Sequence, residues 1–121
     1  MIVVDTSVWI NHFRRRESIL PTLIATRKIL LHPYVHGELM LGGLPSIGPA
    51  AEELLELRRC PVASAAEAAA FIGWAELTGT GIGYVHAHLL LSARLLAKGQ
   101  LYTSDRGLHA QALRLGVAYA P

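Results

Sequence analysis

The chain has 121 residues, of which 52% are hydrophobic and 17% are charged, and its formal net charge is +2. This length predicts a single domain over residues 1–121, and the lone cysteine, Cys60, excludes an internal disulfide and predicts a reducing, cytoplasmic setting. No apolar run reaches the roughly 18 residues that a membrane-spanning helix needs, so no membrane span is expected, and the apolar surplus predicts a protein partner instead.

Short apolar runs alternate with helical patterns along the chain. In chain order, the apolar runs predict short strands at residues 2–5, 29–32, 61–63, 101–104 and 117–119. The segments between them predict helices at residues 6–15, 17–27, 33–41, 49–58, 65–77, 84–97 and 106–115. Such alternation is typical of an α/β fold, in which helices cover both faces of a central, mainly parallel sheet of four to five short strands.

Sequence signals also mark where two of these helices begin or end. Ser64 is followed three positions later by Glu67, which predicts a capping box at the helix start. Pro33 is typical of a first helical turn, and the Gly42-Gly43 pair is typical of a helix end.

The two aspartates of the chain, Asp5 and Asp105, lie near its opposite ends. Each stands where a predicted strand ends and a predicted helix begins. Because chemistry in open α/β sheets gathers at the carboxyl ends of strands, we expect the two carboxylates to share one acidic pocket. An acidic pocket in a chain of positive net charge indicates a divalent cation.

Glu38 is a third candidate ligand, on the predicted helix that follows the second strand. Its helical neighbours are apolar, so its carboxylate either faces solvent or needs a partner such as a metal ion. The hydroxyls of Thr6, Ser7 and Thr103 flank the aspartates and either bond a ligating carboxylate or cap helices. Mg²⁺ or Mn²⁺ held by carboxylates activates water and stabilises charge in phosphodiester cleavage.

Four segments bear these residues, with the sequences IVVDTSVWI at 2–10, HGEL at 36–39, GIGYVHAHLL at 81–90 and YTSD at 102–105. In this order they resemble the PIN-domain ribonucleases, and among these the VapC-type toxins of bacterial toxin–antitoxin pairs. The resemblance covers essentially the whole chain and implies a PIN-like three-layer α/β/α sandwich. It also implies Mg²⁺- or Mn²⁺-dependent endonucleolytic cleavage of RNA, homodimers, and neutralisation by a cognate VapB-type antitoxin.

Residue by residue, the resemblance assigns catalysis and metal binding to Asp5, Glu38 and Asp105. Ser7 and Thr103 match the family's hydroxyls beside the first and last acids. No nucleotide cofactor is expected, because the glycine-rich turn at residues 79–83 follows a predicted helix rather than a strand.

The chain departs from the family at position 86, where an aspartate usually opens the helix after the glycine-rich turn. His86 therefore takes the fourth catalytic and metal-ligating position. Three explanations are open: a working ligand in a natural variant, a non-catalytic PIN-fold module that binds antitoxin or RNA, or a loss-of-function substitution selected during expression of a toxic protein. His88 lies two residues on, so we expect it to point away from the pocket, toward an interface.

Basic residues supply candidate contacts to RNA phosphates. Arg14, Arg15 and Arg16 form a cluster, which is compatible with a polyanion but also typical of a solvated helix end. Arg106 adjoins Asp105 and is the strongest of these candidates. We expect His32, like other histidines without ligand-like spacing, to lie at the surface or to cap a helix.

Overall fold

The computed structural model describes residues 1–15, 18–43 and 49–121. Within these ranges, three short parallel strands form one sheet: β1 (Ile2–Val4), β2 (Ile29–Leu30) and β3 (Gln100–Tyr102), in the order β2-β1-β3. The helices are α1 (Thr6–Arg15), α2 (Leu20–Ala25), α3 (Pro33–Leu41), α4 (Pro49–Glu56), α5 (Ala65–Trp74), α6 (Tyr84–Leu95) and α7 (Arg106–Arg114).

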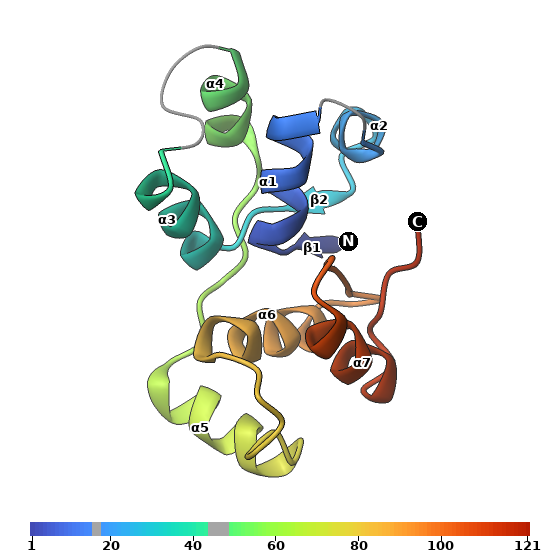
Figure 1. Ribbon diagram of the computed structural model, residues 1–121. Helices are drawn as coiled ribbons and strands as arrows, with labels where there is room; N and C mark the ends of the chain where they lie inside the picture. The colour runs from blue at the N-terminus through green and yellow to red at the C-terminus, as the bar shows by residue number, and fades with distance from the viewer. Residues whose placement is uncertain (16–17, 44–48) are drawn as a thin grey trace.

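The helices form layers on both faces of the sheet (Figure 1). Helices α1 to α4 lie on one side, and α5 to α7 lie on the other. This arrangement follows from parallel pairing, since each parallel strand must be reached by a crossover that covers one face. The predicted α/β class with a parallel sheet between helical layers is confirmed. No described helix has the length and hydropathy to span a membrane.

The predicted number of strands, four to five, is wrong, because the described residues form three. The segments predicted at 61–63 and 117–119 are not strands. Instead, single isolated bridges join Leu31 to Arg59 and Leu101 to Ala118, one at each edge of the sheet. After the first bridge, Pro61 supplies no N–H group with which to continue the ladder. The chain therefore touches the sheet at both places without pairing along it.

Buried side chains from every described strand and helix form one hydrophobic core, to which β1 and α6 contribute the longest buried runs. Val3 and Val4 of β1 are fully buried, and α6 contacts both β1 and β3. Seven consecutive residues of α6, 87–93, are buried, including Leu89 and Leu90 at 0% exposure. Burying a leucine side chain contributes about 1.5–3 kcal/mol, so α6 is held against the sheet along most of its length.

Side chains cap the starts of α5 and α3. Ser64 and Glu67 form the predicted capping box, each accepting the other's backbone N–H, at 3.1 and 2.9 Å. At α3, Nδ1 of His32 accepts from the backbone N–H of Tyr34 at 3.0 Å. His32 thus has the capping role that was one of its two expectations, but it is fully buried rather than at the surface.

His88 is also buried, at 1% exposure, so the expectation that it faces an interface is wrong. Its ring lies 4.8 Å from that of Tyr34 and 4.7 Å from that of Tyr84, and 6.1 Å from that of His32. Burial, and the neighbouring His88, lower the pKa of His32 to about 4. Burial also lowers the pKa of His88.

Acid should therefore destabilise the fold through His32. Its pKa is about 6.5 in the unfolded chain and about 4 in the folded one, so the unfolded chain binds the proton first as pH falls. The stability that neutral His32 contributes is present above pH 6.5 and is lost between about pH 6.5 and pH 4. We expect His32→Asn, which keeps a capping acceptor but cannot titrate, to flatten this dependence in urea unfolding. An unchanged pH slope in the variant would contradict the assignment.

Candidate functional site

Asp5 is the buried centre of the site, at 2% exposure, and it directly follows β1. Its backbone N–H donates to the carbonyl of Tyr102 at 2.9 Å, so the pairing of β1 with β3 fixes its position. Its side-chain Oδ2 accepts two hydrogen bonds, from the hydroxyls of Ser7 and Thr103, both at 2.8 Å. One carboxylate oxygen is thus held by two donors from opposite ends of the chain.

The two hydroxyls are oriented in turn by the backbone. Oγ of Ser7 accepts from the N–H of Ser104 at 3.1 Å, and Oγ1 of Thr103 accepts from the N–H of Asp105 at 3.0 Å. Because each hydroxyl has one hydrogen, accepting from an N–H leaves that hydrogen free to point at Asp5. The network therefore directs both hydroxyl hydrogens to the same oxygen.

His86 faces the other oxygen of this carboxylate. Its Nε2 lies 3.7 Å from Oδ1 of Asp5, and its side chain is 27% exposed. His86 stands in the first turn of α6, and the packing of α6 on β1 brings the two side chains together. Within the described residues, no hydrogen bond reaches Oδ1 of Asp5, so this oxygen faces His86 without a hydrogen-bond partner.

The two remaining acids lie at the edge of the site and are exposed. Oε1 of Glu38, on α3, accepts from the hydroxyl of Thr6 at 2.7 Å. Oδ1 of Asp105 caps α7 by accepting from the N–H of Leu108 at 2.8 Å. Among the described residues, no three His, Cys, Asp or Glu side chains lie close enough together to hold a metal ion. Each of these acids is therefore held by its own hydrogen bonds, and the three do not cluster around one point within the described residues.

Asn11 also belongs to this network, although the motifs do not point to it. Its side-chain amide donates to Oγ of Ser104 at 3.2 Å. The available signal is its spacing from Ser7, because residues four apart on a helix share a face.

Over 120 residues the chain is 38% identical to ribonuclease VapC32 of Mycobacterium tuberculosis, in the strains CDC 1551 / Oshkosh and ATCC 25618 / H37Rv. The match covers 99% of this chain and 97% of that protein. The chain belongs to the VapC family of PIN-domain proteins.

Two solved structures share the fold of this VapC-family chain. The crystal structure of FitAcB from Neisseria gonorrhoeae matches with a TM-score of 0.60 and 22% identity, over 98% of this chain and 95% of that one. The crystal structure of PAE2754 from Pyrobaculum aerophilum matches with a TM-score of 0.60 and 15% identity, over 92% of this chain and 78% of that one. No protein-family model matches the chain.

The arginines predicted to contact RNA lie on two helices of this VapC-family fold. Arg14 on α1 and Arg106 on α7 are both exposed, and Arg106 adjoins the capping Asp105. The side chain of Arg15 and the whole of Arg16 lie outside the described residues.

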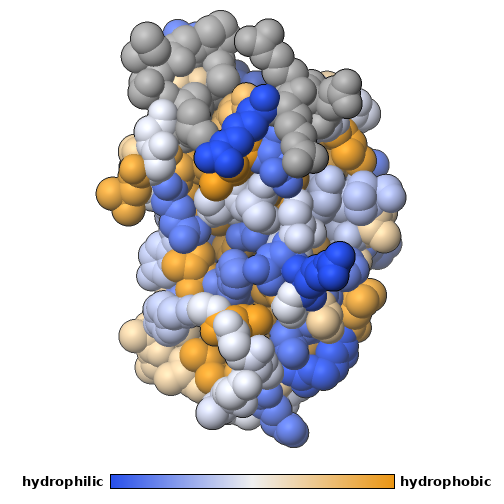
Figure 2. Space-filling view, viewed as in Figure 1, coloured by the Kyte–Doolittle hydropathy of each residue, from blue (hydrophilic) through white to orange (hydrophobic). Residues whose placement is uncertain are grey.

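Figure 2 shows hydrophilic side chains across the middle of one face, with hydrophobic side chains exposed on either side.

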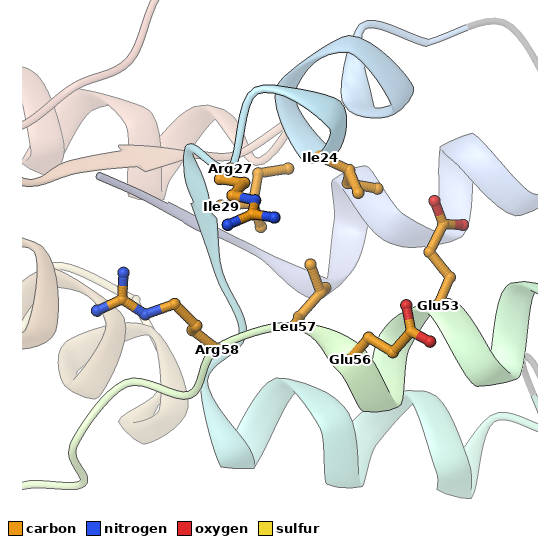
Figure 3. A pocket seen from close by; sticks show the side chains of 7 residues that line it. All are labelled: Ile24, Arg27, Ile29, Glu53, Glu56, Leu57 and Arg58. Atoms are coloured by element: carbon orange, nitrogen blue, oxygen red, sulfur yellow. The ribbon is translucent and has the colours of Figure 1, made fainter.

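A separate pocket of about 380 Å³ lies between α2, β2 and α4 (Figure 3). It is lined by Ile24, Arg27, Ile29, Glu53, Glu56, Leu57 and Arg58. Figure 3 shows Arg58 turned away from the two glutamates, which project from α4. None of the acids, hydroxyls or histidines around Asp5 lines this pocket, so it is not the place where the VapC-type chemistry is expected.

Thr103 should be important for stability as well as for the site. In Thr103→Val the shape is kept, but Asp5 loses a donor and the N–H of Asp105 loses its acceptor. We expect a loss of about 1–3 kcal/mol in the free energy of unfolding, measured with urea, because buried polar groups are left unpaired. Thr78→Val, at an exposed position, is the matched control and should change stability by less than about 0.5 kcal/mol. Equal losses in the two variants would contradict the network.

Proposed function

We propose that this chain is a metal-dependent endoribonuclease toxin of a toxin–antitoxin pair, and that its residues 1–121 form a single domain. One observation carries the proposal: a buried carboxylate, Asp5, has one oxygen held by two hydroxyls and the other open toward His86. It stands at the carboxyl end of the central strand, where α/β sheets place their chemistry. The identity to ribonuclease VapC32 over nearly the full length supports RNA as the substrate.

The donor chemistry of the site fits a hard divalent cation, Mg²⁺ or Mn²⁺. Mg²⁺ keeps several waters and is commonly held by only one or two carboxylates together with substrate phosphates. Oδ1 of Asp5 is the carboxylate oxygen that accepts no hydrogen bond among the described residues, so we propose it as a metal ligand. Asp105, Glu38 and His86 are the further ligands that we propose. When bound, the ion supplies an activated water and neutralises charge on the phosphate.

The protein's own residues hold and orient the reacting groups. Ser7 and Thr103 keep Asp5 in one rotamer, which is the task of residues behind a metal ligand. Arg106 and Arg14 are exposed and offer guanidinium groups to RNA phosphates. Arg106 starts the helix that Asp105 caps, so it is the closer of the two in sequence to the site.

Two groups of exposed apolar side chains are available for partners. Met40 and Leu41 on α3 and Leu55 on α4 are 62%, 92% and 66% exposed. Trp74 on α5 and Leu95 on α6 are 61% and 68% exposed. We propose that a VapB-type antitoxin and a second copy of the chain are the two partners that cover such surface.

A second candidate function is a PIN-fold module that binds antitoxin or RNA without cleaving it. Two observations favour it: the imidazole at the fourth ligand position, and the lack of a three-donor cluster among the described residues. In this case His86 would reduce or abolish the activity that an aspartate at position 86 supports.

Cleavage of an RNA pool decides between these functions. We expect the chain to cleave with Mn²⁺ and to stop with EDTA, and His86→Asp to cleave with Mg²⁺. Asp5→Asn keeps the shape but not the charge and should lower cleavage by at least about 100-fold, since it removes the proposed central ligand. Cleavage by His86→Asp alone would mean that the site assignment stands and that His86 disables the nuclease in this chain. Cleavage that survives in Asp5→Asn, or its absence in every variant, would contradict the enzyme.

A further inference from the structure

Oδ1 of Asp5 and the imidazole nitrogen of His86 form a pair of potential metal ligands, one an oxygen and the other a nitrogen. Oδ2 of Asp5 is occupied by two hydroxyls at 2.8 Å each, so only Oδ1 is available to a cation. Among the described residues, the basic group that pairs with Oδ1 is Nε2 of His86, at 3.7 Å. One oxygen and one nitrogen thus face the same small space, and both belong to side chains held by packed secondary structure.

This separation suits two ligands of one metal ion. At ligand distances of about 2.1 Å, two donors lie about 3.0 Å apart at a right angle and about 4.2 Å apart when opposite each other. The observed 3.7 Å falls between these limits. His86 and Asp5 therefore need little rearrangement to share an ion, and waters or a substrate phosphate would complete its coordination.

We propose that this pair selects a nitrogen-accepting transition-metal ion, such as Ni²⁺ or Zn²⁺, over Mg²⁺. The inference rests on the proposed metal-dependent function and names the class of ion that this chain prefers. Imidazole is a good ligand for first-row transition metals, whereas Mg²⁺ favours carboxylate, carbonyl and water oxygens. In addition, an imidazole leaves the pair with one negative charge instead of the two that an aspartate at position 86 would give, which weakens the hold on Mg²⁺ most.

The two buried histidines, His32 and His88, are less suitable ligands for the ion than His86. Nδ1 of His32 already accepts from the N–H of Tyr34, and both His32 and His88 are almost completely inaccessible. Within the described residues, neither histidine forms an ion pair with a carboxylate, whereas His86 does. His109 on α7 is partly exposed, and among the described residues its side chain takes part in none of the hydrogen bonds around Asp5, so it serves as the matched control position.

The test measures ion binding separately from catalysis. Ni²⁺ and Mg²⁺ are titrated calorimetrically into the full chain above the ordinary pKa of histidine, and into His86→Asp, His86→Asn, Asp5→Asn and His109→Gln. Melting temperatures without metal confirm that each variant is folded. The quantity compared is the ratio of the Mg²⁺ to the Ni²⁺ dissociation constant, because every oxygen site also prefers Ni²⁺ to some degree.

We expect His86→Asp to bind Mg²⁺ more tightly and to lower this ratio by at least about tenfold, and Asp5→Asn to lose both ions. His86→Asn should weaken Ni²⁺ binding, and His109→Gln should leave the ratio unchanged. An unchanged ratio in His86→Asp, or no saturable binding of Ni²⁺ to the parent chain, would overturn the inference. If the ratio follows residue 86 but no variant cleaves RNA, the ion preference stands and the proposed catalytic function fails.

Discussion

The site depends on the two hydrogen bonds that Oδ2 of Asp5 accepts from Ser7 and Thr103. One donor follows β1 and the other follows β3, and Thr103 lies 98 residues from Asp5 in sequence. Because a buried carboxylate is costly unless its charge is compensated, the end of the chain must return to its start for Asp5 to be tolerated. The pairing of β1 with β3 makes this return, and the Thr103 hydroxyl also links the backbone N–H of Asp105 to the carboxylate of Asp5.

Helix α6 is the second constraint, because it serves both the core and the site. Its buried face packs on β1 and β3, and its first turn carries His86 to within 3.7 Å of Asp5. A helix that is anchored by buried leucines has little freedom to move a ligand toward or away from its partner. The identity of residue 86, rather than a conformational adjustment, therefore decides what this position offers to an ion.

Much of the architecture was predictable from local signals, and the remainder required long-range contacts. The alternation of apolar runs with capped helical segments predicted the three-layer fold, and Ser64 with Glu67 predicted a capping box that is present. The number of strands was not predictable, because the lengths of edge pairings depend on tertiary geometry. Helical spacing separated His86 from His88 but did not reveal that His88 is buried between Tyr34 and Tyr84.

The placement of the site residues shows the same division between local and long-range signals. Aspartates at strand ends indicated a shared edge of the sheet, and the hydroxyls beside Asp5 are where the motifs suggested. The roles assigned to Asp5, Glu38, Asp105 and His86 stay predictions. The bond from Thr6 to Glu38 crosses from α1 to α3, and no spacing within one segment could have specified it.

Paramagnetic broadening of amide NMR signals in the labelled full chain would locate the cation that we propose Asp5 and His86 to bind. At substoichiometric Mn²⁺, we expect the amides at residues 5–7, 86 and 103–105 to broaden first. Broadening that begins instead around Glu53 and Glu56 of the separate pocket, or that is uniform over the chain, would contradict it.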